Sequence, residues 1–186
     1  RPLVLAIPRG ALPIGLVVAK ALSGDLDVVL VRKLGAPFNP EFAVGSVGES
    51  GQLFVADYAE RAGANDAYLA EEATKQLTKI RQRRSQYDQV HQPIAIAGRT
   101  VIVVDDGMAT GSTMCAALRE IRAQQPSKLI CAVPVASPDA IARVRPLCDG
   151  ICCLDVETEF GGVGQFYRDF RQVEDCETLA MLRDTP

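Results

Sequence analysis

The chain has 186 residues, of which 48% are hydrophobic and 23% charged, and its formal net charge is −3 at pH 7. This composition is typical of one globular domain with a sizeable core, and the lack of a basic excess argues against nucleic-acid binding. No apolar run approaches the roughly 18 residues of a membrane-spanning helix, and no signal-peptide pattern is present. We therefore expect a single cytoplasmic domain over residues 1–186, without membrane or nucleic-acid partners.

The six cysteines do not predict a metal site. Cys148, Cys152 and Cys153 cluster, but C-x3-C-C is not a zinc spacing and no histidine lies nearby. Cys131, Cys152 and Cys153 lie in apolar, strand-like runs, where a free cysteine behaves as a small hydrophobic residue. We expect reduced thiols in the core.

The chain opens with a strand, a short polar turn and a helix. Residues 3–7 are an apolar run that predicts a strand, and Pro13 suits the first turn of a helix. This helix continues to residue 21 with hardly a polar residue, so we expect it to be largely buried. Between them, Arg9 is a suitable cation for a phosphate, and its alternative is a surface arginine in a strand–helix turn.

A second strand is predicted over residues 27–33, and it ends in the cations Arg32 and Lys33. Four glycines and two prolines within residues 34–51 predict a loop, part of which, residues 43–48, is expected to pair with residues 52–56. For the two cations, the alternative to a functional role is a solvated strand end.

Residues 66–90 show an amphipathic helical pattern with basic residues in its later turns. Cations there complement the helix dipole, so a solvated helix end is favoured over a nucleic-acid face for Arg81, Arg83 and Arg84. His91, the only histidine, is assigned no role.

The most informative stretch is residues 100–113. The first five of them, Thr-Val-Ile-Val-Val, predict a strand buried on both faces, which ends at Asp105 and Asp106. A loop of small and hydroxyl-bearing residues follows and leads into a helical pattern from Met114. A helix start offers unpaired N–H groups to a phosphate, and two carboxylates can accept hydrogen bonds from a diol or hold Mg²⁺. Both features suit a ribose 5-phosphate.

Beyond this stretch, strands are predicted over residues 129–135 and 150–156, with a helix between them capped by Ser137 and begun by Pro138. Alternating strands and helices predict an α/β fold whose mainly parallel sheet carries helices on both faces, with its ligand at the carboxyl ends of the strands. A final short helix, capped by Asp175, is expected to run through Leu182.

The motif around Asp105 resembles a known signature. Two acidic residues after an apolar strand, three variable positions and then T-G-x-T, read here as Asp105-Asp106-Gly107-Met108-Ala109-Thr110-Gly111-Ser112-Thr113, resemble the phosphoribosyl pyrophosphate (PRPP) motif of the type I phosphoribosyltransferases. Neither a Walker A pattern nor a G-x-G-x-x-G turn after a strand is present. The resemblance covers nearly the whole chain and implies an enzyme of nucleotide metabolism that moves the 5-phosphoribosyl group of PRPP to a nitrogen acceptor.

The resemblance also implies roles for particular residues. Arg9, Gly10 and Ala11 occupy the place of the loop that binds pyrophosphate, although the second glycine of the common form is Ala11 here. The stretch from about 34 to 51 corresponds to a flexible loop, with Arg32 and Lys33 near the pyrophosphate as the catalytic cations. The ribose 5-phosphate and Mg²⁺ would be held by the motif itself, with Asp105 and Asp106 as the metal-binding pair and residues 107–113 as the remaining contacts.

The last part of the chain corresponds to the hood that selects the acceptor, at about residues 157–172. Phe160, Gly164 and Asp169 follow the order of the family's base-binding residues at a different spacing; a loop packing aromatic rings on the sheet edge is the alternative. Purine-specific members place an Asp where Ala109 stands, so hypoxanthine and guanine are expected to be poor acceptors. A PRPP or nucleotide sensor without transfer activity is the second hypothesis, and family members are often homodimers.

Overall fold

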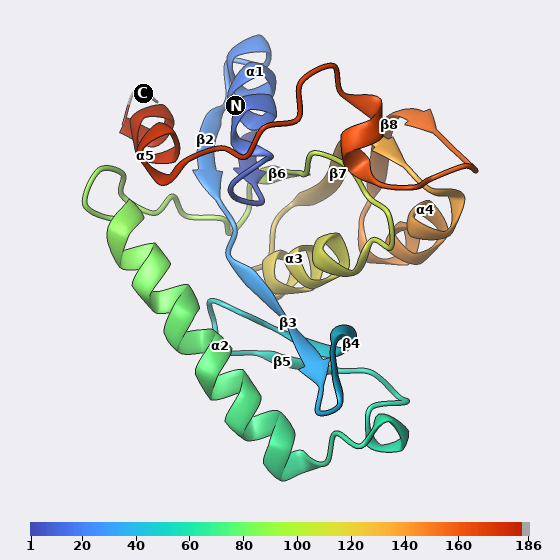
Figure 1. The fold of residues 1–186 in the computed structure, drawn as a ribbon. Coiled ribbons are helices and arrows are strands. Elements are labelled where there is room, and N and C mark those ends of the chain that lie inside the picture. Colours follow the sequence, from blue (N-terminus) through green and yellow to red (C-terminus); the bar gives the residue numbers. More distant parts are fainter. Residues whose placement is uncertain (184–186) are drawn as a thin grey trace.

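The computed structural model describes residues 1–183, and its core is a five-stranded parallel sheet (Figure 1). The strands lie in the order β2 (Asp25–Val28), β1 (Leu3–Ala6), β6 (Thr100–Val104), β7 (Lys128–Ala136) and β8 (Gly150–Val156). Every neighbouring pair is parallel, which confirms the predicted sheet. All four residues of β1 are buried because this strand and β6 lie inside the sheet with helices on both faces.

Alternate residues of the central strands face two separate cores. Val4, Ala6 and Ile102 pack toward α1 (Leu12–Ala21), α2 (Asp66–Tyr87) and α5 (Asp175–Arg183). Leu3, Leu5 and their neighbours pack toward α3 (Ser112–Ala123) and α4 (Pro138–Val144). Helix α1 is less buried than predicted: Leu12, Gly15 and Ala19 are buried, but Val17 is 68% exposed because the helix covers only one edge of the sheet.

A small antiparallel sheet forms a second lobe below the parallel sheet in Figure 1. Its strands are β3 (Val31–Ala36), β4 (Asn39–Gly48) and β5 (Leu53–Val55). The single strand predicted over residues 27–33 is therefore wrong, since β2 ends at Val28 and the chain crosses into the other sheet at Val31. Most of residues 34–51, predicted as a loop, forms the β3–β4 hairpin, whereas the predicted pairing of residues 43–48 with 52–56 is confirmed.

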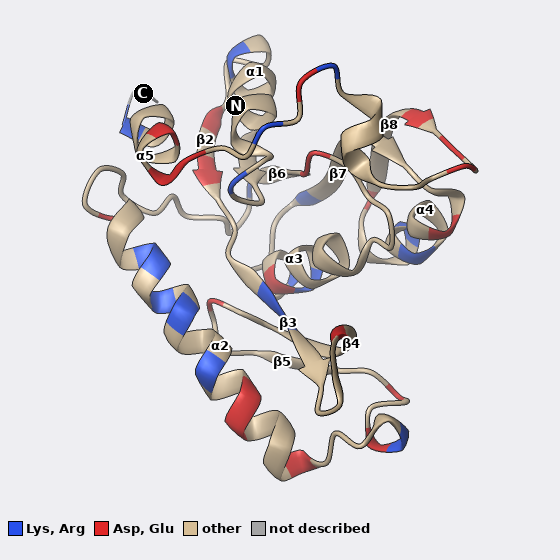
Figure 2. Cartoon of the chain, viewed as in Figure 1, with Lys and Arg blue, Asp and Glu red and all other residues tan. Residues whose placement is uncertain are grey.

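Helix α2 holds the two sheets together through Arg84. Figure 2 shows the cations gathered on the later half of this helix, and Arg84 among them turns inward. Its Nη2 donates to Glu49 Oε1 at 2.7 Å and to the Val28 carbonyl at 3.1 Å, and its Nη1 lies 3.4 Å from Asp27 Oδ1. Burial raises the pKa of Glu49 although Arg84 opposes that change. The prediction of a solvated helix end is wrong for this arginine.

Helix α3 holds the same part of the small lobe from the other side. Glu120 is buried, and its carboxylate accepts hydrogen bonds from the Ser50 N–H at 2.9 Å and from the Ser50 hydroxyl at 2.7 Å. Gly48 lies so close that a Cβ there would be 2.1 Å from Glu120 Oε2. Arg84 and Glu120 thus fix neighbouring residues of the β4–β5 turn to the main body.

The rest of the described chain consists of short helical turns and connections. Three 3-10 segments occur, η1 (Glu60–Ala62), η2 (Arg145–Leu147) and η3 (Val163–Phe166). Ser137 caps α4 as predicted, whereas Asp175 is the first residue of α5. Cys152 is exposed because β8 is an edge strand, so the expectation of a core thiol is wrong there. Within the described residues, no helix is long and apolar enough to cross a membrane.

Candidate active site

The loop between β6 and α3 forms a cradle, defined here as residues 105–113, at the carboxyl end of the central strand. Met108 is buried and pairs with the end of β7, its N–H donating to the Val135 carbonyl at 3.0 Å. The Ser137 hydroxyl donates to the Ala109 carbonyl at 2.7 Å while accepting from the Ala140 N–H. The cradle is therefore fixed by β7 and α4, and the Met108 side chain faces the core, so a substrate could reach only its backbone.

The phosphate-binding part of the cradle is the start of α3. Gly111 has φ of +72°, a left-handed conformation that suits glycine, and a Cβ there would also lie 3.3 Å from Ala140. Thr110 and Ser112 are hydrogen-bonded to each other at 3.1 Å through their hydroxyls, next to Thr113. The first N–H groups of a helix lack intrahelical partners, so this 12-residue helix presents donors and the positive end of its dipole to the cradle.

Asp105 and Asp106 form the other end of the cradle. Asp105 Oδ1 accepts a hydrogen bond from the Asp106 N–H at 2.9 Å. Burial, reinforced by the charge of Asp106, raises the pKa of Asp105 to about 8, and burial also raises the pKa of Asp106. Within residues 1–183 neither carboxyl group forms an ion pair, and two such groups held together are suited to a diol or a cation, which would favour their ionised forms.

The loop after β1 closes the cradle from the opposite side. A Cβ on Gly10 would lie 2.1 Å from Asp106 Oδ2, so glycine is required for this close approach. Ala11 is buried with φ of −77°, which shows how an alanine replaces the family's second glycine without strain. Arg9 Nη1 lies 3.2 Å from Asp175 Oδ1 of α5, and the peptide bond between Pro8 and Arg9 is cis. Residues 7–10 and 105–114, with Val163, line a cavity of about 410 Å³.

A basic cavity of about 310 Å³ adjoins the cavity of about 410 Å³ and shares Ile7, Pro8 and Thr113 with it. Its charged lining residues are all cations, namely Arg32, Lys33, Lys79 and Arg83. Arg32 and Lys33 both line this cavity, and Lys33 also forms an ion pair with Glu41 at 2.7 Å. The cavity is suited to a second, multiply charged anion next to the bound phosphate.

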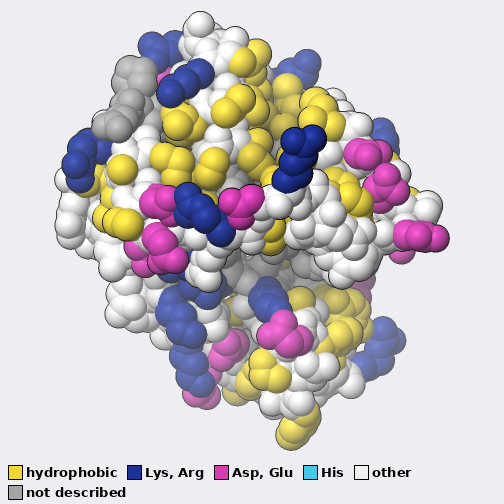
Figure 3. All heavy atoms as spheres, turned by 45° about the horizontal axis from the view of Figure 1, so that its top comes forward, with side chains coloured by type: hydrophobic (Ala, Val, Ile, Leu, Met, Phe, Trp, Pro, Cys, Tyr) yellow, Lys and Arg dark blue, Asp and Glu magenta, His cyan; other side chains and the backbone are white. Residues whose placement is uncertain are grey.

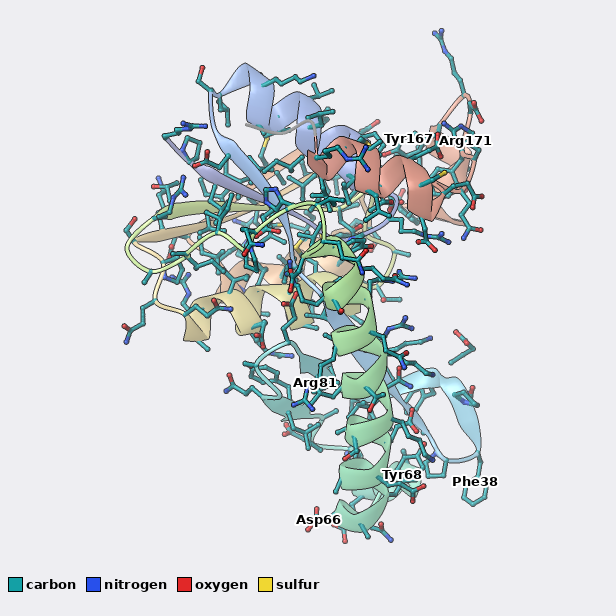
Figure 4. The ribbon with its side chains drawn as sticks, turned by 90° about the vertical axis from the view of Figure 1, so that its left-hand side faces the viewer. Phe38, Asp66, Tyr68, Arg81, Tyr167 and Arg171 are labelled. Carbon is teal, nitrogen blue, oxygen red and sulfur yellow. The ribbon has the colours of Figure 1, made fainter. Side chains whose placement is uncertain are left out.

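The segment after β8 covers the cradle on its remaining side. The Tyr167 hydroxyl donates to the Asp106 carbonyl at 2.6 Å, and burial, with the nearby aspartates, raises its pKa to about 12. Val163 packs on Gly107, where a Cβ would lie 2.8 Å from the valine. Figure 4 shows Tyr167 and Arg171 close together at the end of the molecule away from Phe38, which lies at the β3–β4 tip.

A cavity of about 580 Å³ lies between this segment and the loop after β1. It is lined by Arg9, Gly10 and Asp106 from the two loops and by residues 167 and 169–173 of the hood, so the predicted Asp169 does face it. Phe160 does not line it; this ring packs on Phe166, with centroids 5.0 Å apart. The predicted base-binding role therefore has geometric support for Asp169 and none for Phe160.

Several side chains of the site carried no sequence signal. Tyr167 and Asp175 reach the site from more than 60 residues away, and only the fold brings them there. The sequence predicts Ser137 as a helix cap. It does not predict the hydrogen bond that the same hydroxyl donates to the Ala109 carbonyl of the cradle. A tyrosine or serine in a polar segment is too common for its pattern alone to indicate such a contact.

The residues of the cradle fit a magnesium ion that is also bound by substrate phosphates and water. Among residues 1–183, no group of three or more His, Cys, Asp or Glu side chains is placed to hold a metal. Mg²⁺ is commonly bound by one or two carboxylates together with substrate phosphates and water. The adjacent Asp105 and Asp106, both with raised pKa values, match that arrangement and not a site built from protein ligands alone.

Comparison with known proteins agrees with this geometry. The family described as "Phosphoribosyl transferase domain" matches residues 1–171. The crystal structure of TT1426 from Thermus thermophilus is 45% identical, with a TM-score of 0.88, covering 98% of this chain and 87% of that one. The AQ2163 protein from Aquifex aeolicus is 14% identical with a TM-score of 0.50, covering 98% of this chain and 66% of its own, and shows the fold alone.

Two proteins from Mycobacterium tuberculosis strains CDC 1551 / Oshkosh and ATCC 25618 / H37Rv, each bearing the name "Putative phosphoribosyl transferase", are 40% identical over 180 residues. The match covers 96% of this chain but only 41% of each relative, so the chain spans less than half the length of these curated relatives. Sequence, cradle geometry and fold agree, and the chain belongs to the phosphoribosyl transferase domain family.

Proposed function

We propose that this protein is a Mg²⁺-dependent phosphoribosyltransferase, which transfers the 5-phosphoribosyl group of PRPP to a nitrogen acceptor and releases pyrophosphate. The observation that carries the proposal is the cavity of about 410 Å³, which is lined at once by the acidic pair, the start of α3 and the loop after β1. A phosphorylated pentose needs all three: acceptors for its diol, donors for its 5-phosphate and room for the group on C1.

The roles of the residues follow from what PRPP presents. The N–H groups and hydroxyls at the start of α3 hold the 5-phosphate, and Asp105 and Asp106 accept hydrogen bonds from the ribose diol. The adjoining basic cavity, with Arg32 and Arg83, receives the pyrophosphate. Asp105 and Asp106 would hold Mg²⁺, which would supply positive charge to the leaving group.

The chemical step needs positioning and charge stabilisation more than covalent help. As the C1–O bond breaks, negative charge grows on the pyrophosphate and positive charge on the ribose. The cations of the basic cavity stabilise the first, and the carboxylates below the ribose stabilise the second. Arg9 faces both the cradle and the larger cavity, so it can hold the departing pyrophosphate only after its ion pair with Asp175 is exchanged.

The acceptor enters the cavity of about 580 Å³ under the hood. The rings of Tyr167 and Phe170, with centroids 5.1 Å apart, provide a surface for a planar acceptor, and Asp169 is the carboxylate available to take its proton. Ala109 is exposed in the cradle and offers no carboxylate. We expect acceptors whose nitrogen is already nucleophilic, with hypoxanthine and guanine as poor substrates.

Pyrophosphate release from Mg-PRPP in the presence of a panel of nitrogenous bases and amines tests the proposal. One or more acceptors should give release that exceeds hydrolysis without acceptor by at least tenfold, and the double variant Asp105→Asn/Asp106→Asn should give none. Fast turnover of hypoxanthine or guanine would contradict the argument from Ala109.

The second candidate, a PRPP sensor without transfer activity, is also favoured by the missing carboxylate at position 109. It predicts PRPP-dependent thermal stabilisation with no turnover of any acceptor in the panel. If PRPP gave no thermal stabilisation and no acceptor were turned over, both candidates would be contradicted.

A further inference from the structure

A further cavity lies between the small lobe and the helices of the main body, beside the site described above. It has a volume of about 530 Å³ and is lined by β3–β5 with the segment that follows, by the first half of α3 and by Arg143 of α4. Figure 3 shows the molecule indented between the upper body and the lower lobe. The cavity shares Ser112 and Thr113 with the cradle and Val31, Lys33 and Thr113 with the basic cavity, but neither Asp105 nor Asp106 lines it.

The charged residues described in the lining of this cavity are all basic. Among its described lining residues none is acidic, and three are cations, Lys33, Arg119 and Arg143. Lys33 is neutralised by Glu41, but neither arginine has a carboxylate partner within residues 1–183. The Arg119 guanidinium lies over the Phe54 ring, whose centroid is 5.5 Å away.

The two free arginines are neighbours. The Cys115 thiol lies 3.9 Å from the Arg143 carbonyl oxygen, and Arg119 follows Cys115 by one turn along α3. Burial raises the pKa of Cys115, and both guanidinium groups oppose that rise, as expected when both lie near the thiol. Side chains four residues apart on a helix share a face, so Arg119 lies on the same face of α3 as Cys115; both arginines line the cavity and are exposed.

The opposite wall of the cavity is apolar and aromatic. It carries Leu53, Val55 and Tyr58, which are 38%, 48% and 40% exposed, together with Phe54. Large apolar side chains beside unpartnered arginines match a ligand that has a planar apolar part and an anionic part. The volume lies within the range of about 300–1,000 Å³ that is usual for small-molecule sites.

We propose that this cavity is a second binding site, separate from the cradle, for a nucleoside diphosphate. Arg119 and Arg143 bind the diphosphate, and the β5 wall packs on the nucleobase. Two guanidinium groups without carboxylate partners balance most of the charge of a diphosphate, whereas an uncharged base would leave both of them without a partner. This site goes beyond the proposed transfer reaction, because PRPP and its acceptor are accommodated elsewhere.

Calorimetric titration of the wild-type protein with ADP and with GDP tests the site. At least one of them should bind with saturation, and Arg119→Gln/Arg143→Gln should weaken that binding at least tenfold. The matched control is Arg61→Gln/Arg81→Gln, which removes two charges from exposed arginines outside the cavity and should bind as the wild type does. Thermal unfolding of both double variants shows that they are folded.

A competition experiment separates this site from the cradle. Saturating Mg-PRPP occupies the cradle, so it should change the dissociation constant of the nucleotide by less than about fivefold, and Asp105→Asn/Asp106→Asn should still bind the nucleotide. The proposal is overturned if neither nucleotide binds, if PRPP displaces it completely, or if Arg119→Gln/Arg143→Gln binds it as tightly as the wild type.

Discussion

Asp105 gives the sharpest stability prediction in this structure. Its carboxyl group is partly buried beside Asp106, and burial together with that neighbouring charge raises its pKa from 3.8 to about 8. Asparagine at this position keeps an oxygen that can accept the Asp106 N–H, now 2.9 Å from Oδ1, and cannot ionise. The substitution Asp105→Asn therefore removes the electrostatic penalty and preserves the local shape.

Proton linkage determines whether the free energy of unfolding rises or falls with pH. Because the folded-state pKa of Asp105 lies above the unfolded one, the folded protein binds this proton more tightly, and stability falls as pH rises from about 4 to about 8. The difference between a pKa of 3.8 and one of about 8 corresponds to at most about 6 kcal/mol. Solvent at the rim of the cradle reduces this, so we expect Asp105→Asn to raise the unfolding free energy by roughly 2–3 kcal/mol at pH 8.5.

Urea unfolding at pH 4.5 and 8.5, with a chelator and without PRPP, measures the effect. At pH 4.5 the variant and the wild type should differ by only about 1 kcal/mol, because Asp105 is protonated in the folded state and pH 4.5 lies only slightly above its ordinary pKa of 3.8, so ionisation stabilises the unfolded chain little. The control is Asp149→Asn, whose pKa is lowered by hydrogen bonding to Arg122 and which should therefore show no gain at pH 8.5. A less stable Asp105→Asn protein at pH 8.5, or a gain equal at both pH values, would refute the reasoning.

Two further substitutions test the closure of the cradle and the joint between the lobes. Gly10→Ala places a Cβ 2.1 Å from Asp106 Oδ2, so the carboxylate must turn away, and the dissociation constant of PRPP should rise at least tenfold; Gly150→Ala, where a Cβ meets nothing, should leave it unchanged. Arg84→Ala leaves buried carboxylates unpaired and should lower the unfolding free energy by about 3 kcal/mol, whereas Arg81→Ala on the exposed face should change it by under about 0.5 kcal/mol. Unchanged PRPP binding by Gly10→Ala, or equal stability of the two arginine variants, would contradict these expectations.

The parallel sheet could be predicted because its central strands, β1 and β6, are buried on both faces. Such strands appear as unbroken apolar runs, and four of the predicted runs, including residues 100–104, are parallel strands in the structure. The start of α3 could also be predicted, because a glycine between hydroxyl-bearing residues, here Gly111, is typical of the residues that begin a helix. In both cases the local sequence carries the information that the fold uses.

The break in the second strand could not be predicted, because the apolar run continues through it. Val29 and Leu30 are buried like their neighbours, yet the chain leaves one sheet before them and enters another after them. What fixes the break is distant: Glu49 accepts the Leu30 N–H at 2.8 Å and also binds Arg84. Glycine-rich residues 34–51 form strands for a similar reason, since pairing with β3 and β5 outweighs their weak strand propensity.

The candidate site divides in the same way. The acidic pair and residues 110–113 lie together where the motif placed them, and Arg32 and Asp169 line adjoining cavities. Tyr167 and Phe160 show what could not be predicted from the sequence. Both are aromatic residues in one glycine-rich segment, but of the two only Tyr167 contacts the cradle. Which aromatic ring faces the site depends on the backbone path of the segment after β8, and the residue pattern of that segment does not predict this path.

The central claim is that residues 105–113 bind a phosphorylated pentose from both ends. A crystal structure of the protein with Mg²⁺ and PRPP tests it most directly. The 5-phosphate should lie at the start of α3, within hydrogen-bond distance of Thr110 and Thr113, with the ribose diol on Asp105 and Asp106. An empty cradle at saturating PRPP, or a ribose bound with its diol away from both aspartates, would contradict the account.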